Sequence, residues 1–191
     1  MRRARTLLLL AGAAASIAAA PADPDWPCVQ RLVPSLTAAT LWPGHAPAAD
    51  WRADPKIAAL VREVTARGRK LEAGAALLEQ FVATRPGAEA IAETFAGLVD
   101  ETNAERNHAI ERLRSINRRQ LALADAASRV TAELRTAPAN APQRDEMVSR
   151  RALMVREYEE VQRTIRYSCE IPVDLEARLG RFAQVLQRGV D

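Results

Sequence analysis

The longest proline-free stretch of the chain, residues 88–135, constrains its fold more than any other feature. As one α-helix, these 48 residues would extend for roughly 72 Å at 1.5 Å per residue. Helix propensity alone does not stabilise a helix this long, so the sequence predicts other helices packed along it. A seam of apolar and small residues keeps a seven-residue repeat through much of the stretch: Phe95, Val99, Thr102, Ala109, Leu113, Ile116, Leu123, Ala127, Val130 and Leu134.

Two polar residues, Arg106 and Gln120, fall on this apolar seam. We interpret them first as buried or boundary residues that fix the register of the helices. A contact with a partner protein is the second interpretation.

A helical hairpin is predicted where the long helix ends. Pro138 and Pro142 enclose a short turn, and a helix is expected over residues 143–169. A connection this short makes the two helices antiparallel neighbours, with Cys169 opposite residues near Glu111. The third helix would therefore cover only the C-terminal half of the second. Its own seam consists of Met147, Met154, Tyr158, Val161 and Ile165.

Residues 55–84 are predicted to form the first helix, with Asp54 as N-cap and Pro55 at the first position. Gly68 lies on its seam and indicates either a close helix crossing or a weak position that the helix tolerates. The seam consists of Ile57, Val61, Val64, Gly68, Leu71, Ala75, Leu78 and Val82.

A last helix is predicted over residues 172–188, where Leu175, Leu179, Phe182 and Val185 form an apolar stripe. Residues 23–53 contain five prolines and all three tryptophans, and we expect an extended arm there.

The predicted fold class is therefore all-α: a helical bundle with a long antiparallel coiled-coil hairpin and a Pro/Trp-rich N-terminal arm. The first helix, the N-terminal half of the second and the last would form a three-helix body, from which the hairpin projects. A compact four-helix bundle with a kinked second helix is the alternative.

The first 22 residues have the pattern of a secretory signal peptide. Arg2, Arg3 and Arg5 precede an uncharged apolar stretch, and small residues follow it. Cleavage near Ala22 would leave residues 23–53 as the arm and 54–191 as the helical domain. A lipoprotein signal acylated at Cys28 is rejected, because Asp-Trp-Pro precedes this cysteine where small and aliphatic residues are required. The expected location is the periplasm, with no transmembrane segment after cleavage.

The chain has two cysteines, Cys28 and Cys169. Export to an oxidising compartment makes a disulfide between them the expected state, and two free buried thiols are the alternative.

The charge balance and the distribution of charges along the chain indicate that nucleic acid is not the partner. Three of the 27 basic residues lie in the signal and none of the 24 acidic ones does, so the mature chain has 24 of each sign. These charges are interleaved, which is not the pattern of a polyanion-binding surface.

We expect no catalytic residues, no cofactor and no metal site. His45 lies in a Gly/Pro-rich loop, and His108 has Glu105 and Glu111 three residues away on either side, a pattern that we interpret as a surface histidine among charges and not as a metal site. The chain also lacks a phosphate-binding glycine loop and a Gly-x-Ser-x-Gly turn.

Trp26, Trp42 and Trp51 are the candidate contact residues for a ligand or a partner. The structural interpretation, in which they attach the arm to the bundle, is favoured.

The sequence between Asp25 and Arg31, Asp-Trp-Pro-Cys-Val-Gln-Arg, resembles the start of mature, uncharacterised exported helical proteins of proteobacteria. This resemblance implies a bacterial periplasm and no particular activity.

The functional expectation is a non-catalytic periplasmic interaction or adaptor protein that docks on another envelope protein. A periplasmic chaperone or ligand carrier is the alternative, and an enzyme or metal carrier ranks last. The heptad seams also suit a homo-oligomer, because they serve coiled coils within and between chains equally.

Overall fold

The computed structural model describes residues 23–43 and 50–190, and every regular element in these ranges is a helix. The predicted all-α class is thus confirmed. The signal-peptide prediction for residues 1–22 lies outside the described residues. The helices are α1 (Ala38–Leu41), α2 (Pro55–Val64), α3 (Leu71–Ala83), α4 (Ala88–Thr136), α5 (Arg144–Ser168) and α6 (Glu170–Gln187).

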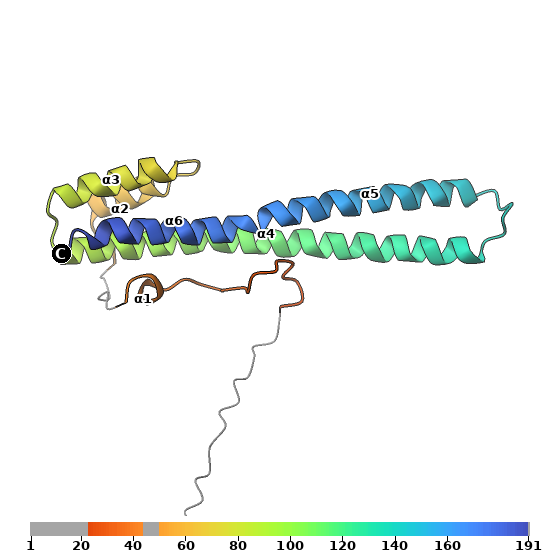
Figure 1. Ribbon diagram of the computed structural model, residues 1–191, viewed down its shortest axis with the longest axis horizontal. Coiled ribbons are helices and arrows are strands. Elements are labelled where there is room, and N and C mark those ends of the chain that lie inside the picture. Colours follow the sequence, from red (N-terminus) through yellow and green to blue (C-terminus); the bar gives the residue numbers. More distant parts are fainter. Residues whose placement is uncertain (1–22, 44–49, 191) are drawn as a thin grey trace, which may run out of the picture.

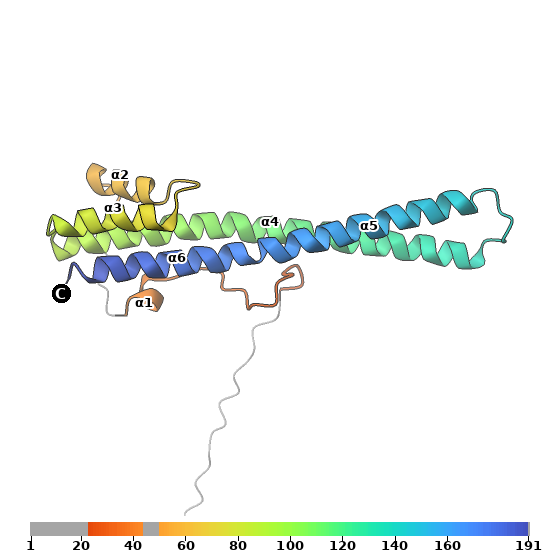
Figure 2. The ribbon, with the colours of Figure 1, turned by 45° about the horizontal axis from the view of Figure 1, so that its top comes forward.

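Helix α4 is the axis of the molecule, and α5 and α6 follow one another along it in the antiparallel direction (Figures 1 and 2). The predicted hairpin is confirmed, because α5 returns along the C-terminal half of α4. Cys169 packs against Leu113, close to the register that equal counting from the turn predicts.

The last helix begins two residues earlier than predicted. Cys169 is both the C-cap of α5 and the N-cap of α6, so Pro172 lies in the first turn of α6. A missing N–H does not break a helix there, since the first backbone N–H groups have no partner within the helix.

The single helix expected over residues 55–84 is wrong, because two helices, α2 and α3, occupy this segment. The break contains Gly68 at φ +77°, in the left-handed region that glycine tolerates best. Gly68 marks no close helix crossing, since a Cβ built there would have nothing within 4 Å. Folding back lets α2 pack on α4 while α3 packs on α6.

The main core lies at this end of the molecule, among α2, α3, α6 and the N-terminal half of α4. Its fully buried side chains include Phe95, Leu98, Leu179 and Phe182. A second, smaller core lies where α5 meets α6 and α4, around Leu113, Val161, Ile165 and Cys169.

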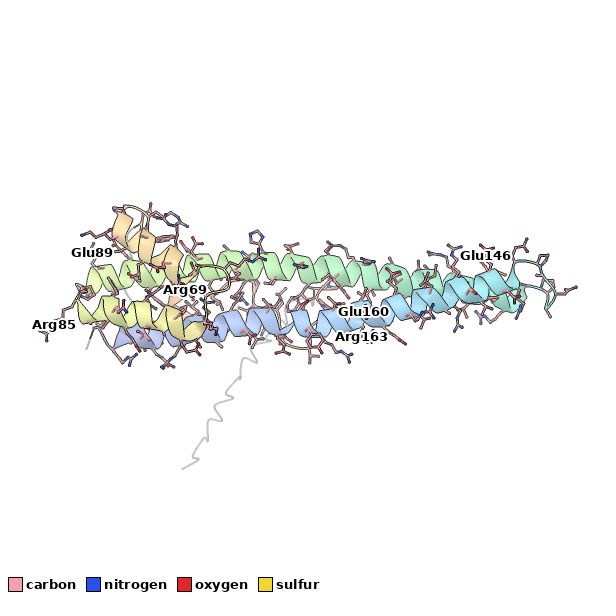
Figure 3. The ribbon with its side chains drawn as sticks, turned by 90° about the horizontal axis from the view of Figure 1, so that it is seen from above. Arg69, Arg85, Glu89, Glu146, Glu160 and Arg163 are labelled. Carbon is pink, nitrogen blue, oxygen red and sulfur yellow. A yellow bond between two sulfur atoms is a disulfide. The ribbon has the colours of Figure 1, made fainter. Side chains whose placement is uncertain are left out.

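Beyond this second core the hairpin projects as two helices alone, as predicted (Figure 1). Val130 is the only buried residue between positions 118 and 160. An exposed ion pair, Arg119–Glu157, joins its two helices, and the pair Arg163–Glu160 lies at its base (Figure 3). We call residues 118–160 the outer hairpin.

Candidate functional site

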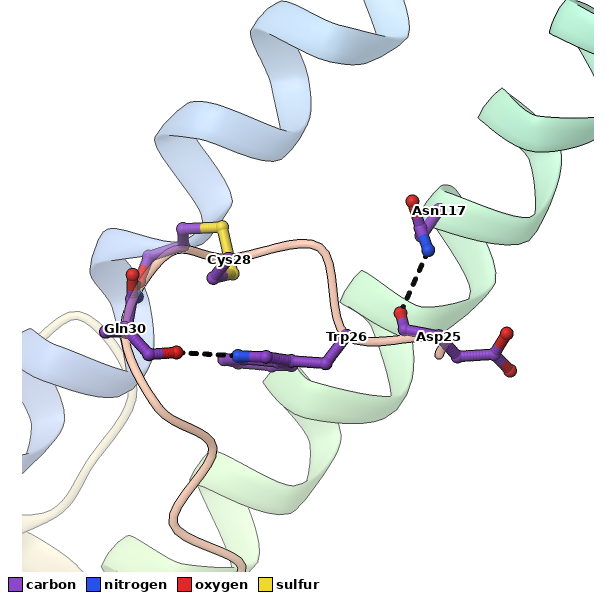
Figure 4. Close-up of a disulfide and its surroundings, with 6 residues drawn as sticks. Asp25, Trp26, Cys28, Gln30 and Asn117 are labelled. Atoms are coloured by element: carbon purple, nitrogen blue, oxygen red, sulfur yellow. Dashed lines mark hydrogen bonds between the residues drawn. A yellow bond between two sulfur atoms is a disulfide. The ribbon is translucent and has the colours of Figure 1, made fainter. Parts of the chain in front are cut away.

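The predicted disulfide is confirmed: Cys28 is bonded to Cys169, with the two Cα atoms 5.7 Å apart. It lies at the base of the hairpin within the smaller core, where Trp26 packs beside it. The arm is thereby fastened across the junction of α5 and α6 (Figure 4). We call residues 23–36 the strap.

Hydrogen bonds hold the strap around the disulfide. The Trp26 indole Nε1 donates to the carbonyl of Gln30 at 2.8 Å, and the Gln30 amide donates to the carbonyl of Cys169 at 2.5 Å. From α4, Asn117 Nδ2 donates to the carbonyl of Asp25 at 3.1 Å (Figure 4). In each of these bonds the acceptor is a backbone carbonyl. The backbone therefore takes part in the attachment of the strap, as well as its side chains.

Ion pairs add to this attachment. Arg114 binds Asp23 and Arg118 binds Asp25, both at 2.7 Å. The Arg114 hydrogen bond, together with the Asp25 backbone N–H, lowers the pKa of Asp23 below its ordinary value of 3.8. The same hydrogen bond and a second one, which Arg114 donates to Glu111, raise the pKa of Arg114.

Further along the strap, Asn103 forms two hydrogen bonds of 2.8 Å with the backbone of Leu36. The α4 residues that hold the strap therefore recur at helical spacing on one side of the helix. Sequence analysis missed this function of Asn103, Arg114, Asn117 and Arg118. Their recurrence near the apolar seam is the signal that would have indicated a docked polar segment.

Arg106, singled out on the seam, is buried as predicted, with 3% of its surface exposed. Its Nη2 donates to the carbonyl of Val33 in the strap at 3.1 Å. Gln120, the other polar residue of the seam, is half-buried in the outer hairpin.

The three tryptophans do not come together. Trp51 is buried in the main core, donates to Asp100 Oδ2 at 2.9 Å, and carries Arg52 4.0 Å above its ring. Trp42 packs on Phe95, with ring centroids 5.4 Å apart, whereas Trp26 belongs to the disulfide cluster. A contact of these residues with a partner stays a prediction.

Two shallow grooves of similar size lie on the body, one between the α2–α3 connection and α4 and the other between α2 and α3. One, of about 550 Å³, has His108, Glu101, Glu105 and Arg67 in its lining. Within residues 23–43 and 50–190, no three His, Cys, Asp or Glu side chains are placed to hold a metal ion. His45 lies outside the described residues.

The second groove, of about 540 Å³, lies between α2 and α3. Its walls are mainly apolar, with Ile57, Leu60, Leu77 and Phe81, and Asp54 lies among its polar residues.

The outer hairpin exposes large apolar side chains: Leu121, Val148, Leu153 and Val155. Val148, Ala152 and Val155 follow one another at four- and three-residue steps, so they share one side of α5. Residues 129–156 contain six arginines and three acidic residues. This part of the hairpin thus combines an apolar stripe with a positive charge excess.

None of the described helices is both long and apolar enough to cross a membrane. No protein-family model, curated protein or solved structure matches this chain.

Proposed function

We propose that this chain is an exported, non-catalytic interaction protein of the periplasm, which docks on another envelope protein through its outer hairpin. The signal-like residues 1–22 support export, and the Cys28–Cys169 disulfide suits an oxidising compartment. The observation that carries the proposal is the exposed apolar stripe on a pair of helices that the body does not cover.

The partner that fits this surface is an acidic amphipathic helix. Its apolar side would lie along Val148, Ala152 and Val155 and extend the two-helix hairpin into a three-helix coil. Its carboxylates would meet the excess of arginines in residues 129–156. The chain from residue 23 is neutral as a whole, so the rest of the molecule has the opposite excess and does not attract the same partner.

The test is site-specific photo-crosslinking in the native envelope. A photoreactive residue at Val155 is compared with one at Glu72, an exposed position of α3 in the body. We expect position 155 to capture one envelope protein through an acidic helical peptide, and position 72 to capture none of it.

Charge reversal supplies the matched control. Arg150→Glu with Arg151→Glu should abolish the cross-link from position 155, whereas Arg181→Glu on α6 should leave it intact. A cross-link to a second copy of this chain, binding to vesicles of anionic lipid alone, or equal yields from both positions would contradict the proposal.

A ligand carrier is the second candidate, because the groove between α2 and α3 is apolar and open. A fluorescent hydrophobic probe should then bind the protein, and Leu77→Gln should weaken that binding while the hairpin cross-link persists. If the probe stays unbound and the protein leaves client aggregation unchanged, the carrier and chaperone functions are both excluded.

A further inference from the structure

The chain from residue 23 contains two methionines, Met147 and Met154, and both lie in the outer hairpin. They are seven residues apart on α5, and Val161, which is buried in the smaller core, follows at the same interval. A seven-residue step returns to the same side of a helix, so both methionines lie on the side of α5 that faces α4. Both are half-buried. They therefore belong to the contact between the two helices and are still within reach of a small molecule in the solvent.

A hydrogen bond between the helices shows where the methionines lie along α4. Arg151, which comes between them on α5, donates from Nε to the Thr131 hydroxyl at 2.9 Å. Val130, the neighbour of Thr131, is therefore level with the turn of α5 that separates the two methionines. Val130 is also the only buried residue between positions 118 and 160. The apolar contact of the outer hairpin thus depends on few side chains, and the two thioethers lie on either side of its best-buried point.

Oxidation changes the chemistry of a thioether more than its size. Hydrogen peroxide attacks thiols and thioethers, and both cysteines of the chain are already bonded to each other. The two methionines are therefore the sulfur atoms on which it acts. The O–O bond of the peroxide breaks, one oxygen atom is transferred to the sulfur, and water leaves. The sulfur is oxidised by two electrons, the peroxide is reduced, and an apolar side chain becomes a polar sulfoxide.

We propose that Met147 and Met154 form an oxidation site, at which a peroxide loosens the outer hairpin by converting both thioethers to sulfoxides. A sulfoxide oxygen between the helices needs water or another donor, so α4 and α5 separate on either side of Val130. The main core contains no methionine and keeps its packing. Loss of the acidic helix that docks on the hairpin would follow, and that consequence alone rests on the proposed function.

The test treats the disulfide-bonded chain from residue 23 with hydrogen peroxide until mass spectrometry finds one added oxygen atom on each methionine. Hydrogen exchange then compares the treated and the untreated protein. We expect the amides of residues 121–134 and 145–158 to exchange about tenfold faster after oxidation, and those of residues 91–99 to keep their rates. Methionine sulfoxide reductases, one for each sulfoxide epimer, should restore the original rates in the hairpin.

Met147→Leu with Met154→Leu is the matched control, because it keeps the apolar volume and removes the sulfur atoms. Its hairpin should exchange like that of the untreated wild-type protein, both before and after peroxide. Met147→Gln with Met154→Gln places polar groups at the same positions without an oxidant, and its hairpin should exchange like that of the oxidised protein.

Three results would overturn the proposal. The hairpin rates could stay the same although both methionines carry oxygen, or the methionines could resist a peroxide dose that oxidises free methionine. The hairpin of the leucine variant could also loosen after treatment, which would place the oxidised group elsewhere. None of these measurements involves a partner, so failure of the docking function would appear only in the cross-linking test.

Discussion

At the scale of single residues, two glycines inside helices occupy opposite environments. A Cβ on Gly97 of α4 would lie 2.7 Å from Val61 Cγ2 and 2.9 Å from the Trp51 ring, whereas a Cβ on Gly180 of α6 would meet nothing within 4 Å. Gly97→Ala should therefore lower the free energy of unfolding by about 1–2 kcal/mol, because overpacking exceeds the gain in helix propensity. Gly180→Ala should raise it by about 0.5–1 kcal/mol. Urea denaturation of both variants measures the difference, and equal effects would contradict this packing.

The strap carboxylate Asp23 provides a second prediction at this scale. NMR titration should give Asp23 a pKa below 3.8, and Arg114→Gln should raise it, because the largest cause of the shift is the Arg114 hydrogen bond. Arg118→Gln is the control and should raise it less, since Arg118 acts on Asp23 only through its charge.

The sign of the pH dependence follows from this shift. Because folding lowers the pKa of Asp23, its contribution to stability is complete above the pKa of the unfolded chain. It is lost as the pH falls through the folded-state value. Attachment of the strap should therefore weaken in acid, below about pH 4, and not at neutral pH.

At the scale of helices, prolines and apolar periodicity predicted the hairpin well. Pro138 and Pro142 predicted the turn, the proline-free stretch predicted the length of α4, and the short connection predicted the antiparallel direction of α5. The division of residues 55–84 was not predictable from the same signal. The apolar period continues across Gly68 without interruption, so it indicates most of the buried residues but not whether the helix is continuous; Leu71, on the same seam, is exposed. Ile57, Val61, Val64, Ala75 and Leu78 are all buried, although they belong to two helices.

The candidate site was predicted only in part. The disulfide and the burial of Arg106 followed from the compartment and from the seam. The contact of Arg106 with the strap did not, because Val33 lies 73 positions away in the sequence, and an extended segment has no periodicity that reveals its docking face. The charge excess of residues 129–156 was overlooked because the chain from residue 23 is neutral as a whole.

The contrast between the two ends of α4 predicts unequal local stability. Its N-terminal half lies in the main core, whereas in the outer hairpin Val130 alone is buried. Amide hydrogens near Phe95 and Leu98 should exchange at least about 100-fold more slowly than those near Ala124 and Met154. Hydrogen exchange followed by mass spectrometry tests this. Uniform protection along α4 would mean that the hairpin is covered, for example by a second copy of the chain.

At the scale of the whole molecule, the disulfide encloses nearly the entire helical fold, since its cysteines are 141 residues apart. In the chain-entropy model, removing it should lower the free energy of unfolding by about 5 kcal/mol. Denaturation of Cys28→Ser with Cys169→Ser measures this loss against the oxidised protein. The reduced wild-type protein controls for the serine side chains. A loss below about 1 kcal/mol would mean that the noncovalent contacts of the strap already restrict the unfolded chain.

The position of this bond also decides how the molecule would carry a mechanical load. Between Cys28 and Cys169 the chain forms a covalently closed loop that contains the helices α1 to α5. Tension applied at Asp23 and at the end of α6 would pass through the sulfur atoms and bypass that loop. Only the strap residues before Cys28 and helix α6 would unfold. The projecting hairpin would therefore stay folded under a force that unfolds α6.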